Sequence, residues 1–306
     1  MLAFVTNPGS DSVSIFDTAT NTVVKKISVG VDSTVGVAIT PDGKIAYVSD
    51  RGARNVGVID IATGVLVNTI EIGKNDPFLV PNANPIAITP DGKHAYVTDA
   101  NGSVLVIYTA TNKVVASVKV GDTPAGVAIT PDGKRAYVAN LGARSVSVVD
   151  TPSNTVLATV EVEPSPQQIA ITPDGKSAYV TCSVDSSSSG NVIVIDTASN
   201  TVKARIQAGE RPNGIALTRD GKRAYVTTLA GDVSTIDTAS NSIIATIAVA
   251  EFFHFGVFIS PDGTRAYVTN DGKHGVVPVI DTGANQVVAN ISVGGSSLAI
   301  AFVPTP

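Results

Sequence analysis

The stretch GVAITPDGKRAYVAN, residues 126–140, consists of two short apolar runs joined by Pro-Asp-Gly. Its Val, Ile and Tyr residues favour β-strands, and Pro-Asp-Gly supplies the fixed and the permissive backbone that a tight turn needs. The stretch therefore predicts a β-hairpin. The same turn, once as Arg-Asp-Gly, begins at Pro41, Pro90, Pro131, Pro173, Arg219 and Pro261. The intervals are 49, 41, 42, 46 and 42 residues, so the hairpin belongs to a repeat of about 42 residues.

The repeat occurs seven times, because the second run has seven copies, from AFVTN to the last AYVTN. A period of about 40 residues with several short strands per unit predicts a β-propeller. In the fourth unit we expect strands A to D at 126–130, 135–140, 145–150 and 155–162. Alternating apolar and polar residues predict that strands C and D bury one face. Between C and D, six units carry Asn and the second carries Gly64, and both residues tolerate a left-handed backbone.

The two ends of the chain predict how the ring closes. The chain begins with a strand B, and its last residues, SLAIAFVPTP at 297–306, match the strand A phrase GVAITP. The C-terminal segment should therefore supply strand A to the blade whose strands B to D come first, which hides the sheet edges. We expect one all-β domain, residues 1–306, that forms a seven-bladed β-propeller with four antiparallel strands per blade.

Composition and motifs argue against several classes of function. Charged residues make up only 15% of the chain, the net charge is −5 and no basic run occurs, so nucleic acid and anionic membranes are poor partners. No stretch reaches the ~20 apolar residues that span a bilayer. The motifs CxxCH, GxGxxG, GxxxxGK[ST] and GxSxG are missing, and so is tryptophan. The one cysteine, Cys182, excludes an internal disulfide, and no histidine is predicted beside it to make it a nucleophile.

The fourth unit, GVAITPDGKRAYVAN followed by SVSVVDTPSNTVLATVEV, resembles the YVTN-type β-propeller repeat of bacterial and archaeal surface proteins. The resemblance covers essentially the whole chain. It implies an extracellular, cell-surface or periplasmic location and the binding of a partner, and similar propellers include lactonases and lyases. The chain enters its first strand at once, as MLAFVTN, without a signal peptide, so a cytoplasmic location also stays open.

Changes in length fall on one face of the predicted propeller. The A–B and C–D turns are uniform in every unit, whereas the B–C and D–A connections vary, and the longest insertion is GKNDPFLVPNANP at 73–85. In a four-stranded blade these two kinds of connection lie on opposite faces. Because function tends to lie on loops that a rigid scaffold presents, we expect the site on the variable face, around the mouth of the central channel.

One D–A connection, within VAEFFHFGVFISPDG at 249–263, is aromatic. His254 aligns with the prolines that precede strand A in other units, so the segment should line the rim of the channel. The residues expected there are Phe252, Phe253, His254 and Phe255. Candidate catalytic residues in the same blade are His254, His274 and Glu251, with Asp271 nearby, because a histidine beside a carboxylate can act as a general base or bind a metal. Alternatively, the phenylalanines plug the channel and the histidines are solvated.

Two further groups of polar residues are predicted on the variable face. Gln167, Gln168 and Asn213 at the channel entrance, with Arg51, Arg54, Arg144 and Arg211 on loops, can hold an anionic or polyhydroxylated ligand, unless they are simply solvated. Strand B ends in a polar residue in every unit, and we expect these seven to form a ring. Two of them, Asp50 and Asp99, lie in neighbouring blades, where they can bind a cation or form local turn bonds.

Two hypotheses of function follow. The first is an exported or cell-surface scaffold, not an enzyme, that binds a protein partner or a small polar ligand through the variable face and the channel mouth. We expect it to be monomeric and to need no cofactor. The alternative is a propeller enzyme, a lyase or lactone hydrolase, with a histidine base at the channel mouth assisted by a divalent cation. The fold alone does not choose between them.

Overall fold

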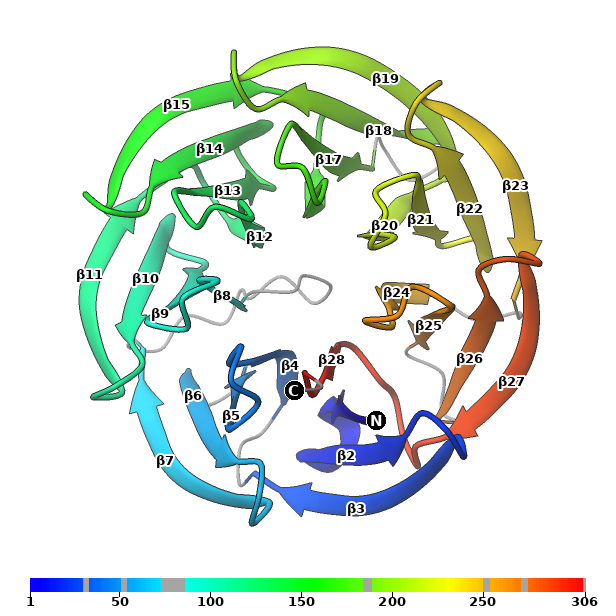
Figure 1. The fold of residues 1–306 in the computed structure, drawn as a ribbon. Coiled ribbons are helices and arrows are strands. Elements are labelled where there is room, and N and C mark those ends of the chain that lie inside the picture. The colour runs from blue at the N-terminus through cyan, green and yellow to red at the C-terminus, as the bar shows by residue number, and fades with distance from the viewer. Residues whose placement is uncertain are drawn as a thin grey trace.

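The computed structural model describes residues 1–29, 33–50, 54–72, 86–183, 189–249, 254–270 and 275–304, with the side chains of Ser189 and His254 excepted. Seven antiparallel sheets of four strands each stand around a central channel (Figure 1). The structure therefore confirms the seven-bladed propeller. Apart from its strands, the described chain has one 3-10 turn, η1 (Pro8–Ser10). No helix in the described ranges is long and apolar enough to cross a membrane.

The strands of each blade run from A at the channel to D at the outer rim. The A strands are β28 (Ile300–Phe302), β4 (Thr34–Ile39), β8 (Ile86–Ile88), β12 (Pro124–Ile129), β16 (Pro166–Ile171), β20 (Pro212–Leu217) and β24 (His254–Ile259). The B strands are β1 (Leu2–Asn7), β5 (Ile45–Asp50), β9 (His94–Asp99), β13 (Arg135–Asn140), β17 (Ser177–Cys182), β21 (Arg223–Thr228) and β25 (Arg265–Asn270). Blades are numbered 1 to 7 in the order of these B strands.

The outer two strands of each blade complete the sheets. The C strands are β2 (Ser12–Asp17), β6 (Asn55–Asp60), β10 (Ser103–Tyr108), β14 (Ser145–Asp150), β18 (Ser189–Asp196), β22 (Asp232–Asp237) and β26 (Val276–Asp281). The D strands are β3 (Thr22–Ser28), β7 (Val65–Glu71), β11 (Lys113–Lys119), β15 (Thr155–Glu161), β19 (Thr201–Glu210), β23 (Ser242–Ala248) and β27 (Gln286–Ser292). In the fourth blade the observed bounds differ from the predicted ones by at most two residues.

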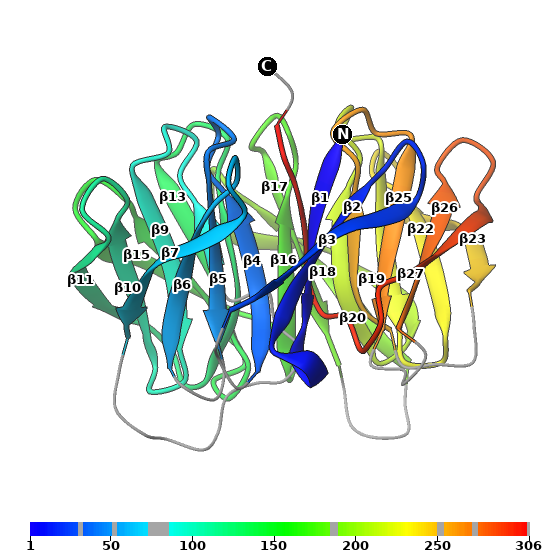
Figure 2. The same ribbon diagram turned by 90° about the horizontal axis from the view of Figure 1, so that it is seen from below.

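The ring closes as predicted. β28 pairs with β1, so that Phe302, Ala301 and Ile300 lie opposite Ala3, Phe4 and Val5. Three backbone hydrogen bonds extend this pairing on either side of the ladder, among them Thr6 N–H to Ala299 O at 3.0 Å. The first blade is thus built from both ends of the chain, and both ends lie on the same face of the ring (Figure 2).

The burial of the C strands differs from the sequence prediction. All of β14 is buried except its last residue, on both faces of the strand, whereas β15 is exposed at most positions. The prediction of one buried face was wrong for strand C because each blade is covered by a neighbouring blade on either side. Apolar clusters between adjacent blades therefore form the core of the protein.

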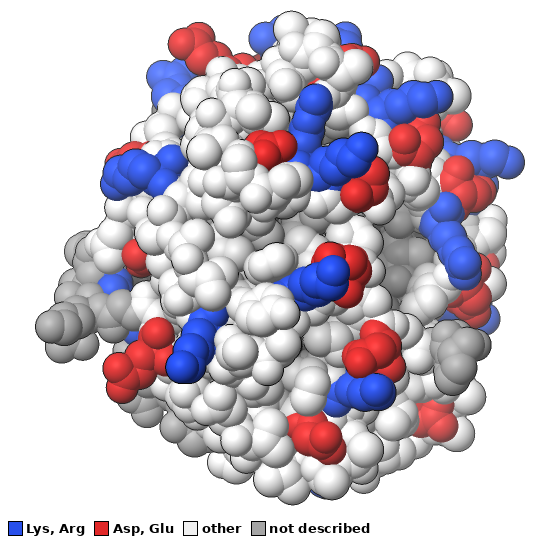
Figure 3. All heavy atoms as spheres, turned by 60° about the vertical axis from the view of Figure 1, so that its left-hand side comes forward, with Lys and Arg blue, Asp and Glu red and all other residues white. Residues whose placement is uncertain are grey.

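The A–B and C–D turns form one face of the ring, here called the turn face, and the B–C and D–A connections belong to the opposite loop face (Figure 2). The turn asparagines have φ between 52° and 55°, and Gly64 has φ 62°. This confirms the left-handed turn that was predicted from the exchange of Asn and Gly. Basic and acidic side chains are interspersed on the surface, without a large patch of one sign in the view of Figure 3.

In five blades the tyrosine of the AYVTN phrase bonds to the next blade, but the Oδ1 of Asn21 in blade 1 receives no such bond from blade 7 within the described residues. Tyr137 donates its hydroxyl hydrogen bond to Asn200 Oδ1, the turn asparagine of the following blade, at 2.8 Å. Equivalent bonds of 2.6–2.9 Å join Tyr47 to Asn112, Tyr96 to Asn154, Tyr179 to Asn241 and Tyr225 to Asn285. In blade 1 the tyrosine is replaced by Phe4, and blade 2 carries Gly64 in place of the asparagine. The two exchanges occur together because a phenylalanine has no hydroxyl to donate.

The aspartates of the repeat stabilise the turns. Asp174 accepts hydrogen bonds from the hydroxyl of Thr172 at 2.7 Å and from the N–H of Lys176 at 3.0 Å, and these bonds lower the pKa of its carboxyl. Hydrogen bonds from turn hydroxyls or backbone N–H groups likewise lower the pKa of Asp17, Asp42, Asp60, Asp91, Asp132, Asp150, Asp196, Asp220, Asp237, Asp262 and Asp281.

These lowered pKa values predict acid sensitivity. A carboxyl whose pKa is lower in the folded than in the unfolded protein stabilises the fold above the unfolded value, and this contribution is lost as the pH falls through the folded value. We therefore expect the free energy of unfolding, measured by urea titration, to change little above about pH 5 and to fall below about pH 4. Asp174→Asn should be less stable than wild type at pH 7 and the difference should shrink at pH 2; a constant difference would contradict the role of the charge.

Candidate functional site

A cavity of about 300 Å³ lies on the central channel, against the A strands of blades 5, 6, 7 and 1. Its wall is formed by β16, β20, β24 and the segment from Leu298 to Phe302. Apart from Gln168, every side chain that lines it is apolar. Its volume lies at the lower end of the range found for small-molecule sites. The side chains of this wall are apolar, but backbone groups of the A strands, which are the inner edges of their sheets, make part of its surface polar.

The residues that shape this cavity depart from the repeat. At the fifth position of strand A, six blades carry alanine, namely Ala38, Ala87, Ala128, Ala170, Ala216 and Ala301. Blade 7 has Phe258 there, and its side chain lines the cavity. At the next position the other blades have Ile or Leu, and blade 1 has Phe302. The other blades carry smaller side chains at these two positions, so an aromatic residue there is not a general requirement of the blade.

Phe258 reaches beyond its own blade. It packs against the cluster between blades 7 and 1 that contains Tyr267 and Ile300, and also against the cluster between blades 1 and 2 that contains Val37 and Ala299. The aromatic side chains of this region thus fill part of the channel and line the space that remains. The sequence analysis identified the aromatic segment at 252–255 but missed Phe258 and Phe302. Aligning the seven A strands position by position identifies both, because each replaces a smaller residue of the other blades.

Of the predicted aromatic segment, Phe255 lines the cavity as the second residue of β24. His254 is the first residue of β24 and pairs through its backbone with Asn270, the last residue of β25. The other predicted residues of this edge lie outside the described residues: Arg51, Glu251, Phe252, Phe253, Asp271 and His274. His94, the one histidine whose side chain is described, lies at the turn face, half-buried, with its ring centroid 5.5 Å from that of Tyr108.

Gln167 and Asn213 occupy the second position of their A strands, at the loop-face end of the channel. Four other blades carry apolar residues at this position, namely Val35, Ala125, Phe255 and Leu298, and blade 3 carries Asn84. Asn213 is only 3% exposed, and both Gln167 Oε1 and Asn213 Oδ1 are buried acceptors for which the described residues supply no donor. A buried acceptor without a donor costs free energy. Hydrogen bonds within the described residues therefore leave these two amide oxygens unsatisfied.

The two A strands that carry these amides are joined by the hydroxyl of one threonine, Thr181. Thr181 Oγ1 accepts a hydrogen bond from Gln168 N–H at 3.1 Å and donates one to Asn213 O at 2.6 Å. The same arrangement recurs at Thr269, which bonds to Gly256 N–H and to Leu298 O. The threonine of the AYVTN phrase thus joins neighbouring A strands, so the channel wall that presents Gln167 and Asn213 is rigid.

The arginines predicted on the loops differ in exposure. Arg144 and Arg211 both have a left-handed backbone, with φ of 50° and 47°, directly before β14 and β20. Arg144 is exposed and Arg211 is partly buried. Arg54 was predicted on the loop surface, but it is only 6% exposed, directly before β6. Arg211, next to Asn213, is thus placed nearest to the channel entrance.

Six of the seven polar residues that end strand B are buried, and the two acidic ones form local bonds, as one of the two predicted alternatives had it. Each of these residues pairs, within its blade, with the start of strand A or strand C, and this pairing buries most of them. The buried residues are Asn7, Asp50, Asn140, Cys182, Thr228 and Asn270, and Asp99 is partly exposed. Asp50 Oδ1 accepts a bond from Ser33 N–H at 3.0 Å, and Asp99 accepts bonds from Asn101. Within the described ranges, no three His, Cys, Asp or Glu side chains lie together as a metal site requires.

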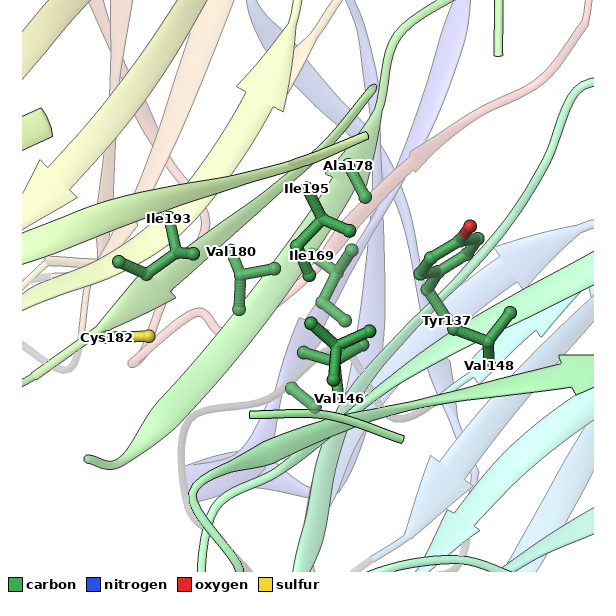
Figure 4. Close-up of a cluster of buried hydrophobic side chains, with 11 residues drawn as sticks. Tyr137, Val146, Val148, Ile169, Ala178, Val180, Cys182, Ile193 and Ile195 are labelled. Atoms are coloured by element: carbon green, nitrogen blue, oxygen red, sulfur yellow. The ribbon is translucent and has the colours of Figure 1, made fainter. Parts of the chain in front are cut away.

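Cys182 is fully buried in the apolar cluster between blades 4 and 5, with Val180 and Ile193 of its own blade (Figure 4). Burial raises the pKa of its thiol well above the usual range, and the nearby Glu163 carboxylate acts in the same direction. A thiol in such surroundings stays protonated and is a poor nucleophile. The side chain serves to pack the core.

Comparison with known proteins identifies the fold. No family model matches the chain, and no curated protein matches its sequence. The hydrazine synthase of Kuenenia stuttgartiensis is 23% identical, with a TM-score of 0.77 over 87% of this chain and 88% of that one. A functionally unknown protein from Desulfotomaculum acetoxidans is 19% identical, with a TM-score of 0.82 over 98% of both chains. The dihydro-haem d1 dehydrogenase NirN, solved in complex with DHE, is 16% identical, with a TM-score of 0.72 over 99% of this chain and 75% of that one.

At these identities the similarity shows a common propeller fold and nothing more specific. It does not confirm membership of the YVTN-repeat family. The function must therefore be argued from the site itself.

Proposed function

We propose that this protein is a non-enzymatic binding propeller that holds a partner at the loop-face end of its channel. The observation that carries the proposal is the pair of buried acceptors, Gln167 Oε1 and Asn213 Oδ1, at positions where four of the other five blades have apolar residues. A partner that presents N–H or O–H groups would satisfy them. Arg211, close by in the chain, adds a cation that suits an anionic or polyhydroxylated group.

A binding role accounts for the described residues better than catalysis does. Within that part of the chain, the channel wall is apolar and the repeat aspartates bond to their own turns. Proteins with this fold nevertheless include enzymes, as the names hydrazine synthase and dihydro-haem d1 dehydrogenase indicate. A lyase or lactone hydrolase that uses His254 therefore remains the alternative that the experiment must address.

The expected location is outside the cytoplasm, at the cell surface or in the periplasm. The resemblance to surface-protein repeats supports this, as does the low content of charged residues, 15%. Protease treatment of intact cells that produce the protein tests the location: an external protein is digested or released, whereas an internal one is protected until the cells are lysed.

Asn213→Ala tests the loop-face site, because alanine is the residue of blade 4 at this position. Removing a buried acceptor without a donor should raise the free energy of unfolding by about 1 kcal/mol, and should abolish binding. Thermal shift against sugars, peptides, lactones and metals measures both effects; a ligand at 100 times its Kd should stabilise wild type by about 2.7 kcal/mol.

Two outcomes would contradict the proposal. A variant that is less stable than wild type but binds the same ligand equally well would show that Asn213 serves the fold. Turnover of a lactone by wild type that is lost in His254→Ala would establish the enzyme instead.

A further inference from the structure

Two pairs of neighbouring blades leave a hollow between their turns on the turn face. Between blades 2 and 3 the hollow has a volume of about 510 Å³, and between blades 6 and 7 its volume is about 590 Å³. Both are walled by the A–B turn of one blade and by the A–B and C–D turns of the next. The shape of the hollow thus comes from the repeat, and the side chains that line it decide what it can bind.

The two hollows carry charges of opposite sign. Each is lined by one aspartate from the A–B turn of either blade: Asp42 and Asp91 in the first, Asp220 and Asp262 in the second. The described residues that line the first hollow include no basic side chain, so its charge is −2. The second hollow is also lined by Arg219, Lys222 and Arg223. Three basic and two acidic side chains give it a charge of +1.

The basic side chains of the second hollow form no salt bridge within the described ranges. Elsewhere on the turn face, Lys44, Lys93 and Lys176 each pair with the aspartate of their own turn at 3.7 Å. Arg219 is exposed and donates one hydrogen bond, from Nη1 to Pro261 O at 3.2 Å. Because a guanidinium has five N–H donors, Arg219 has donors left for an anion.

The two aspartates of this hollow are bound within their own turns. Asp220 Oδ1 accepts hydrogen bonds from the hydroxyl of Thr218 at 2.6 Å and from the N–H of Lys222 at 3.0 Å. Asp262 is held in the same way by hydroxyl and N–H groups of its turn. These carboxylates reduce the attraction for an anion but do not take up the basic side chains as salt-bridge partners.

The corresponding positions between blades 4 and 5 provide a matched comparison. They carry the same residue type at seven of the nine positions that line the hollow between blades 6 and 7. One of the shared arginines makes the same bond in both places: Arg135 donates from Nη1 to Thr197 O, and Arg223 donates from Nη1 to Thr282 O. Arg223 therefore serves the contact between blades, and a ligand must be argued from the positions that differ.

Only two of the nine positions differ. Arg219 stands where blade 4 and the four other Pro-Asp-Gly copies have proline. Gly283 stands where five blades have alanine and blade 4 has Pro152. The φ of Gly283 is not positive, so the turn itself does not require glycine there. One change adds a cation from blade 6 and the other removes a methyl group from blade 7, so both favour an anion in the same hollow.

We propose that the hollow between blades 6 and 7 binds a phosphate group, either free or as the ester of a small molecule. A phosphate carries about two negative charges and three strong acceptor oxygens, so it can accept charge-assisted hydrogen bonds from both Arg219 and Lys222. Gly283 leaves room beside them. The volume of about 590 Å³ lies within the range of small-molecule sites, so a group that carries the phosphate also has room.

This site goes beyond the loop-face function, because it lies on the opposite face of the ring and uses other residues. Either proposal can fail without the other.

Isothermal titration calorimetry at low ionic strength with inorganic phosphate, glucose 6-phosphate and glucose tests the site. Both phosphates should bind at one site per chain and glucose should not, and added NaCl should weaken the binding because it screens the charges. Tighter binding of glucose 6-phosphate would identify an ester as the ligand, and equal binding would identify the free ion. No binding of either phosphate to wild type would overturn the proposal.

Variants test the two positions that differ. Arg219→Pro restores the residue of the other copies and should weaken phosphate binding by about tenfold or more, because a charge-assisted hydrogen bond is lost. Lys176→Gln, which removes a turn-face cation of blade 5, should leave the binding unchanged. Urea denaturation checks that each variant folds.

The converse variant, Pro131→Arg with Ala198→Gly, places both changes between blades 4 and 5, where Lys134 and Arg135 are already present. It should raise the stoichiometry from one phosphate per chain to two. Equal binding by wild type and Arg219→Pro, or an unchanged stoichiometry in the folded converse variant, would overturn the proposal.

Discussion

Removal of residues 297–306 should abolish cooperative unfolding. The deletion removes β28, the innermost strand of the first blade, and with it the pairing between Ile300–Phe302 and Ala3–Val5 that closes the ring. Ile300 is 3% exposed, and Phe302 packs with its ring centroid 5.3 Å from that of Tyr267. Losing the burial of the apolar side chains of this segment costs about 1.5–3 kcal/mol for each large one. Their sum is comparable with the 5–15 kcal/mol by which most domains are stable.

The control is a chain that ends at Pro304, which keeps β28 and its hydrogen bonds. It should melt as wild type does in calorimetry and in circular dichroism, while the longer deletion should give a broad transition or none. A sharp, unshifted melt of the longer deletion would show that closure between the two ends does not hold the ring together.

The second large effect is expected at the tyrosine bonds between blades. Tyr137→Phe removes the hydroxyl that donates to Asn200 Oδ1 at 2.8 Å and leaves that acceptor without its donor. We expect the free energy of unfolding to fall by about 1–2 kcal/mol, measured by urea denaturation. Asn200→Gly should be destabilising for the same reason, although glycine suits the φ of 54° at this turn.

The natural pair Phe4 and Gly64 predicts how the double variant behaves. Tyr137→Phe with Asn200→Gly should be less destabilised than the sum of the two single variants, with a coupling of about 1 kcal/mol, because the bond can be lost only once. Additive losses would mean that tyrosine and asparagine act separately and that the pairing in blades 1 and 2 is coincidental.

The fold was predictable from the sequence because the same pattern of strands and turns occurs seven times. A single Pro-Asp-Gly turn is weak evidence, but its recurrence with an Asn or Gly at a fixed later position indicates a blade. The predicted strands of the fourth blade and the closing strand at Ile300–Phe302 are confirmed. The burial of strand C was not predictable from alternation, because a strand covered on both faces can keep small polar residues such as Ser147 inside.

The candidate site was only partly predictable. Phe255, Gln168 and Asn213 could be placed near the channel because they adjoin strand A. Arg219 and Phe302 belong to different blades, and nothing in the one-dimensional sequence shows that they line the same space at the turn face. At the end of strand B, polar residue type alone did not show whether a side chain is accessible or, like Asn140, buried inside its blade.

The central claim of this account is that departures from the repeat serve binding, whereas the repeat itself serves folding. One variant tests it directly: Gln167→Ala, Asn213→Ala and Arg219→Pro together, which place the residue types of other blades at three sites. Its free energy of unfolding without ligand, from urea denaturation, should equal or exceed that of wild type. A loss of more than about 1 kcal/mol in stability would contradict the claim, since it would show that these residues are required by the fold.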